Sequence, residues 1–165
     1  MRKPILALGV VFVVLAMLSC AQQPTPAAKE TVSTEADVEV IERLFENNEL
    51  LISSGDLDGW IDQFTEDAVF MPSDSPVAMG KEAGREFARP WYEHFDVEFS
   101  ISVDEIEVHG NWAFARWSFT SLATPKSGGD TTERSGKEIW ILKRQNDDSW
   151  RCSHIIYNYD SSPSV

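Results

Sequence analysis

The hydrophobic pattern of the chain changes its period at Phe95, and this change constrains the fold more than any other feature. Beyond Phe95 apolar and polar residues alternate, which is the pattern of β-strands with one buried face. Short turn sequences such as HGNW and NDDS separate the alternating segments, so the strands are expected to pair as antiparallel hairpins. The predicted strands cover residues 97–108, 112–123, 133–144 and 150–159.

The first of these strands contains a slip of one residue in its alternation. Apolar residues at 97, 99, 101 and 103 share one phase, and Ile106 and Val108 share the opposite phase. Such a slip predicts a β-bulge near Asp104 and Glu105, and a bulge bends the sheet that contains it.

The residues before Phe95 follow a helical period instead. Helices are predicted over residues 34–54, 57–64 and 80–95, with Gly55 ending the first helix and Gly80 opening the third. Pro90 is expected to kink or divide the third helix. A short strand is predicted over residues 68–72. Helices followed by a run of hairpins indicate an α+β fold, with the helices packed on one face of a bent antiparallel sheet.

The N-terminus has the layout of an export signal. Arg2 and Lys3 precede an apolar run over residues 5–18, which is too short to span a bilayer comfortably. The run ends in Ser19 and Cys20, which resembles the lipobox of bacterial lipoproteins. Residues 1–19 are therefore predicted to be a lipoprotein signal peptide and Cys20 the lipidated residue, with an ordinary signal peptide and a free Cys20 as the alternative. The lipoprotein is expected to be located at the outer membrane of the cell envelope, facing the periplasm.

Composition divides the rest of the chain and limits its partners. Residues 20–33 are polar and contain proline, as in a flexible tether; residues 34–160 form one domain, and residues 161–165 a disordered tail. The formal net charge is −13, and it falls to about −15 once the basic signal is removed. This charge disfavours a nucleic-acid-binding surface, and it disfavours contact with anionic lipid beyond the anchor.

Five carboxylates lie close together in SSGDLDGWIDQFTEDA, residues 53–68. An EF-hand loop starting at Asp56 would need an oxygen ligand and then a glycine at its fifth and sixth positions, where Trp60 and Ile61 stand. The stretch is instead expected to start, turn and solubilise helices, with Asp56 as an N-cap and Asp58 in the first helical turn. No metal site and no cofactor are predicted.

Three segments resemble the nuclear transport factor 2-like superfamily, in particular its SnoaL-like and ketosteroid isomerase-like branches. SGDLDGWIDQFTEDAVF is similar to the segment that joins the first two helices to the first strand. MPSDSPVAMGKEAGREF is similar to the turn that opens the third helix, and GKEIWILKRQNDDSWRCSHIIYN to the paired C-terminal strands. The resemblance covers residues 36–160. It implies a cone-shaped (cystatin-like) fold in which a curved sheet wraps three helices around an apolar pocket, and it implies dimers formed through the sheet.

The resemblance does not carry isomerase chemistry with it. That chemistry needs a carboxylate base at the end of the first strand, and the position falls on Met71 or Pro72. The position of the phenol falls on Asn48, an amide that is expected either to be hydrogen-bonded in the core or to face a pocket.

The remaining candidates for acid–base chemistry are Asp74, His154 and Glu138. Glu138 is expected to form an ion pair with Arg116 across neighbouring strands, with polar groups that line the pocket as the alternative for both residues. Asp74 is expected to serve a turn. His154 shares a phase with Cys152, so it is expected to face inward, and Cys152 itself is expected to be a core residue rather than a nucleophile.

Aromatic and apolar side chains are expected to form the pocket, together with one amide. The predicted pocket residues are Asn48, Trp60, Phe64, Phe70, Phe87, Trp91, Trp117, Trp140 and Tyr157. Apolar residues in both phases of the strands at 112–119 and 150–159 predict a homodimer through the sheet, with an exchange of faces at the bulge and a half-buried second phase as the alternative.

Three functions fit these features. The first is an exported, lipid-anchored protein that binds a small apolar molecule without demonstrable catalysis. The second is an isomerase-, lyase- or cyclase-type enzyme acting on a small hydrophobic substrate, provided that its candidate groups converge in one cavity. The third is a protein-interaction module that uses the sheet.

Overall fold

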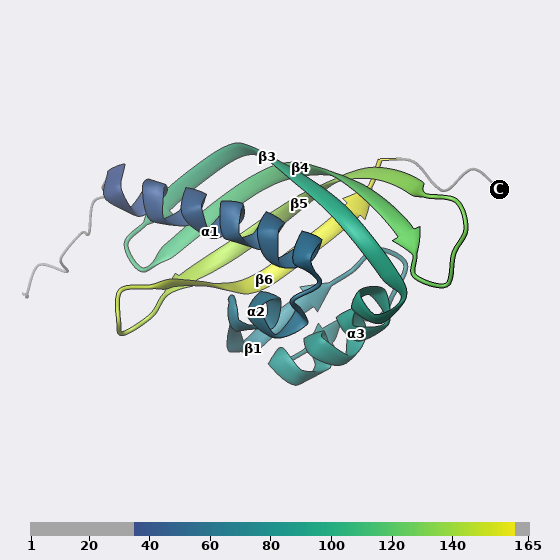
Figure 1. Ribbon diagram of the computed structural model, residues 1–165. Coiled ribbons are helices and arrows are strands. Elements are labelled where there is room, and N and C mark those ends of the chain that lie inside the picture. The colour runs from purple at the N-terminus through teal and green to yellow at the C-terminus, as the bar shows by residue number, and fades with distance from the viewer. Residues whose placement is uncertain (1–34, 161–165) are drawn as a thin grey trace, which may run out of the picture.

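A computed structural model describes residues 35–160, in which three helices lie against one curved sheet (Figure 1). The helices are α1 (Glu35–Ser54), α2 (Leu57–Asp62) and α3 (Lys81–His94). The strands are β1 (Phe64–Met71), β2 (Ala78–Met79), β3 (Phe95–His109), β4 (Trp112–Pro125), β5 (Thr132–Arg144) and β6 (Trp150–Tyr159). The α+β class and the order of helices before long strands are as the sequence predicts.

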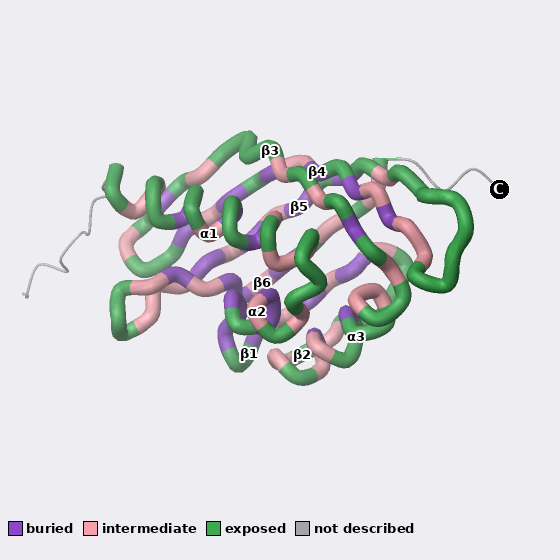
Figure 2. The backbone as a smooth tube through the Cα atoms, viewed as in Figure 1, coloured by how far each residue is buried: buried purple, intermediate pink, exposed green. Residues whose placement is uncertain are grey.

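The strand order in the sheet is β2-β1-β6-β5-β4-β3. Three successive hairpin pairings join β3 to β6, whereas β1 pairs with β6 in parallel. The predicted bulge is confirmed, because the pairing of β3 with β4 shifts register between Val103 and Glu105. The long strands therefore curve around the helices, and along them buried segments alternate with half-buried and exposed ones (Figure 2).

The core lies between the inner face of the sheet and the helices. Phe45 on α1 lies 5.7 Å from Trp117 and 5.2 Å from Trp140, measured between ring centroids. Truncation of one such buried ring costs about 3–5 kcal/mol of stability. The aromatic residues that the sequence contributes to both helices and strands thus join the two layers.

Helix α1 also covers the free edge of the sheet at β3. The backbone N–H of Ile101 donates to Glu49 Oε2 over 2.9 Å, and that of Phe99 donates to Ser53 Oγ over 3.0 Å. These side chains occupy backbone donors that an exposed edge strand would otherwise offer to another chain.

Two features differ from the sequence prediction. Pro90 lies inside a continuous helix α3 and does not divide it. Strand β1 begins at Phe64 instead of residue 68, because Phe64 already pairs with Cys152 of β6 and the N–H of Cys152 donates to the carbonyl of Gln63. Within residues 35–160 no helix is long and apolar enough to cross a membrane. The predicted signal peptide, tether, tail and Cys20 lie outside the described residues.

Candidate functional site: an aromatic cavity on the inner face of the sheet

A partly open cavity of about 200 Å³ lies between the helices and the inner face of the sheet. Its walls are formed by residues of all three helices and of the strands β1, β3, β4, β5 and β6, together with Pro72, which follows β1. Its lining is formed by Asn48, Ile52, Trp60, Phe70, Met71, Pro72, Phe87, Ala88, Trp91, Tyr92, Phe99, Trp117, Phe119, Ser121, Glu138, Ile155, Tyr157 and Tyr159.

Two rows of side chains form the sheet side of this cavity. In the first row Glu138 of β5 pairs in register with Trp117 of β4 and with Tyr157 of β6. In the second row Gly136 lies between Phe119 and Tyr159 in the same way. Residues two positions apart on a strand share a face, so both rows point toward the helices.

The glycine in the second row is required by packing. A Cβ at Gly136 would lie 2.5 Å from Cζ of Phe119 and 2.6 Å from the carbonyl oxygen of Asn158. The missing side chain lets the rings of Phe119 and Tyr159 meet above β5, 6.0 Å apart and close to perpendicular.

Glu138 is the one acidic residue in the lining. The indole Nε1 of Trp140 donates to its Oε1 over 2.5 Å, and among the residues that the structure describes its other oxygen has no hydrogen-bond partner. Burial raises the pKa of the Glu138 carboxyl to about 8, against the opposing effect of the hydrogen bond from Trp140. At neutral pH this carboxyl is therefore mostly protonated, and it can donate a hydrogen bond or exchange a proton.

The predicted ion pair between Glu138 and Arg116 is wrong. Arg116 pairs in register with Ile139, so it lies on the outer face of the sheet, where it contacts Asp104 and Glu105 at 2.9 and 3.3 Å. Neighbouring residues of one strand point to opposite faces, and the bulge in β3 places both acidic partners on the outer side.

The other two acid–base candidates lie away from the cavity. Asp74 is an exposed turn residue with a positive φ of 57°, in agreement with the turn role expected for it. His154 faces Ile141 on the outer side of the sheet, because a register shift in the β5–β6 pairing exchanges the faces of β6 after Cys152. The three candidates therefore do not converge, and only Glu138 lines the cavity.

Most of the predicted pocket residues line the cavity, with two exceptions. Phe64 and Trp140 are fully buried core residues outside the lining. The prediction missed several lining residues whose strand or helix pattern gave no reason to separate them from the core. These are Ile52, Met71, Pro72, Ala88, Tyr92, Phe99, Phe119, Ser121, Ile155 and Tyr159.

Asn48 meets both expectations made for it. It lines the cavity, and its Oδ1 accepts a hydrogen bond of 3.0 Å from Gln63 Nε2. Its Nδ2 is buried and without a partner, as are the indole Nε1 of Trp117 and the hydroxyl of Tyr92. Desolvation raises the pKa of the Tyr92 phenol, with a smaller effect from Asp56.

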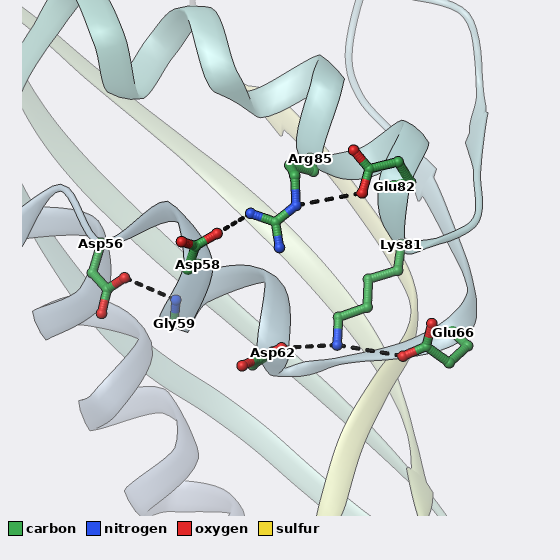
Figure 3. A network of polar contacts seen from close by, with 8 residues as sticks. All are labelled: Asp56, Asp58, Gly59, Asp62, Glu66, Lys81, Glu82 and Arg85. Atoms are coloured by element: carbon green, nitrogen blue, oxygen red, sulfur yellow. Dashed lines mark hydrogen bonds and ion pairs between the residues drawn. The ribbon is translucent and has the colours of Figure 1, made fainter.

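The acidic stretch before β1 has the structural role that its spacing predicts (Figure 3). Asp56 accepts from the backbone N–H of Gly59 over 2.9 Å and caps α2. Asp58 pairs with Arg85, and Asp62 pairs with Lys81 at 2.9 Å. These contacts join α2 to α3, so the acidic stretch holds the helical wall of the cavity in place.

A family comparison agrees with this geometry. The model of the SnoaL-like domain family matches residues 31–148. The chain belongs to the SnoaL-like domain family. Comparison with functionally curated proteins gave no match.

Solved structures place this SnoaL-like domain in the nuclear transport factor 2-like fold. A ketosteroid isomerase-like protein from Erwinia carotovora is 22% identical with a TM-score of 0.71, and the match covers 78% of this chain and all of that one. A conserved protein from Planctomyces limnophilus is 21% identical (TM-score 0.70; 76% and 99% covered). A nuclear transport factor 2-like protein from Salmonella enterica is 18% identical (TM-score 0.66; 79% and 95% covered). At these low sequence identities the similarity to the three structures establishes the fold alone.

Proposed function

We propose that the SnoaL-like domain binds a small, mainly apolar molecule in the cavity on the inner face of the sheet. The observation that carries this proposal is the cavity itself, which has aromatic walls and one protonatable group and opens toward solvent. Concave, mostly apolar sites with few polar groups are the usual form of small-molecule sites.

A pair of tryptophan substitutions on α1 tests this proposal. Ile52→Trp adds bulk inside the cavity, whereas Leu50 on the same helix is 67% exposed and Leu50→Trp adds the same group outside it. Native mass spectrometry and thermal shift against a panel of apolar metabolites should detect a ligand with the unaltered protein and with Leu50→Trp. Binding should be lost with Ile52→Trp. A ligand that Ile52→Trp retains at unchanged affinity would place the site elsewhere.

A second candidate function is proton-transfer catalysis, and the position of Glu138 favours it. Met71 and Pro72 line the cavity where the isomerase-like relatives are expected to hold their base, and neither can accept a proton. Glu138 lies on a different strand, in the cavity, with a pKa of about 8, which suits a general acid or base near neutral pH.

Hydrogen–deuterium exchange of an enolisable ketone tests this catalysis without knowledge of the substrate. Incubation of 2-tetralone in deuterated buffer should give faster α-deuteration with the protein than without it, measured by mass spectrometry. Glu138→Gln should lower the rate by about 10²-fold or more. Glu133→Gln on the exposed start of β5 is the matched control and should keep the full rate. Equal rates with and without protein would leave binding as the function.

We also propose that Cys20 anchors the chain in the bacterial envelope, on the outer membrane facing the periplasm. The basic, apolar and Ser-Cys order of residues 2–20 supports it. Cys20→Ser should move the protein from the detergent phase to the aqueous phase of a cloud-point partition. Partition of the unaltered protein into the aqueous phase would contradict lipidation.

A homodimer through the outer face of the sheet remains our proposal for its assembly. Phe114 pairs with Ile141 and Ile139 with Ile156 on this face, and Ile156 is 45% exposed. Light scattering should report a dimer that Ile156→Lys converts to monomer and that Leu50→Lys, at an exposed position of α1, does not. A monomer at all concentrations would favour use of this face by a different protein.

A further inference from the structure

Four aromatic side chains and one carboxyl are arranged in a nearly closed circle on the sheet side of the cavity. The ring centroids of Trp117 and Phe119 lie 6.0 Å apart, those of Phe119 and Tyr159 6.0 Å, and those of Tyr159 and Tyr157 5.8 Å. Glu138 closes the series, because it pairs in register with both Trp117 and Tyr157. All five of these side chains line the cavity.

Within residues 35–160, the cavity lining contains an acidic group but no basic group. Among the cavity-lining residues that the structure describes there is no lysine, arginine or histidine, and Glu138 has no cationic partner. The guanidinium of Arg134, which is outside the lining, already lies over the ring of Tyr159 at 5.0 Å. The chain as a whole carries a formal charge of −13, which raises the local concentration of cations near its surface.

We propose that the cavity selects organic amines, with the apolar body against the aromatic walls and the protonated nitrogen against Glu138. This inference rests on the proposed function and adds the chemical class of the ligand. Aromatic faces attract a desolvated cation, and a carboxylate that accepts from an ammonium forms a charge-assisted hydrogen bond. The amine supplies the partner that a buried carboxylate lacks in this site.

The unpartnered N–H groups near the cavity do not select a different ligand. Nε1 of Trp117 and Nδ2 of Asn48 are buried below its surface, with essentially no accessible area. The polar side-chain groups that the sheet side still contributes to the lining are the free oxygen of Glu138, the hydroxyls of Tyr157 and Tyr159, and the hydroxyl of Ser121, which donates to the carbonyl of Arg134 over 3.5 Å.

Amine binding is coupled to the proton on Glu138. The titratable groups around it are Tyr157, Tyr159 and Cys152 on β6, Arg134 on β5 and Tyr92 on α3, while β4 contributes aromatic side chains and α1 the amide of Asn48. Burial raises the pKa of Cys152, Tyr92 and Tyr157, so these groups stay neutral below pH 9. A protonated amine that binds at pH 7 therefore displaces the proton of Glu138.

The test compares three probes with one skeleton: 2-aminotetralin, 2-tetralol and 2-tetralone. Calorimetry at pH 7 should give an affinity for the amine at least about tenfold above that for the alcohol and the ketone. Repetition in buffers of different ionisation enthalpy should show release of about one proton on amine binding at pH 7, and this release should become small as the pH is raised to 9.

Two variants separate the possible outcomes. Glu138→Gln should bind all three probes about equally and release no proton, whereas Glu133→Gln should behave like the unaltered protein. Equal affinity of the unaltered protein for amine and alcohol, or a preference for the ketone, would overturn the amine inference and leave the proposed function standing. Failure of all three probes to bind at millimolar concentration would count against both.

Discussion

Replacement of Glu138 by glutamine should make the stability of the domain less dependent on pH. The carboxyl has a pKa of about 8 in the folded protein and 4.5 as its ordinary value, so between these values the folded state holds more protons than the unfolded state. Stability must therefore fall as the pH rises through this window. A difference of about 3.5 pKa units corresponds to a loss of up to about 5 kcal/mol, which is a large share of the 5–15 kcal/mol typical of a domain.

Glutamine keeps the size of the side chain and an oxygen that can accept from Trp140, but it has no proton to lose. The two proteins should be of similar stability at pH 5, and the glutamine variant should be the more stable by several kcal/mol at pH 9. Urea denaturation followed by tryptophan fluorescence at constant ionic strength measures this difference. Glu133→Gln controls for the change of net charge. Parallel stability profiles of the unaltered protein and Glu138→Gln from pH 5 to 9 would refute the argument.

Three further perturbations have definite expected results. Arg144→Met removes a half-buried contact of 2.6 Å with Asp37 on α1 and should lower the free energy of unfolding in urea by about 3 kcal/mol. Arg116→Met, which removes exposed ion pairs on the outer face, should lower it by less than about 1 kcal/mol. Equal losses in the two variants would contradict this. Gly136→Ala places a methyl group 2.5 Å from an aromatic ring, so it should lower stability by about 1–3 kcal/mol and weaken ligand binding; an unchanged melting temperature would show that the ring moves freely. In a Cys20→Ser chain the buried Cys152, whose pKa burial raises, should react with a thiol reagent only in denaturant, and rapid labelling of the folded protein would contradict its burial.

Periodicity along the chain predicted the three helices and the five longer strands of the described residues, but not the short strand β2. The change from helical to alternating pattern at Phe95 marks the junction of α3 with β3, and the phase slip after Val103 marks the bulge that curves the sheet. Both signals are local, because the side-chain period reports which face of one element is buried. The cap at Asp56 was predictable for the same reason.

The site could be predicted only in part. The aromatic residues predict a large apolar core. Composition does not distinguish those that line a cavity from those that, like Phe64 and Trp140, are packed on all sides. The partner of Glu138 could not be predicted either, since it depends on the register between β4 and β5. In that register Glu138 lies opposite Trp117 and Arg116 lies opposite Ile139, so Arg116 points to the outer face and Glu138 to the inner face.

The sequence by itself thus determined the helices, the longer strands, the bulge and the acidic charge, because each follows from neighbouring residues and their spacing. Only the tertiary structure decided that Glu138 lies among four aromatic side chains, without a cationic partner in the described part of the chain, because the register of the sheet brings residues from three strands together there. Burial and register are properties of the assembled sheet, and they set the pKa on which the chemistry of this cavity depends.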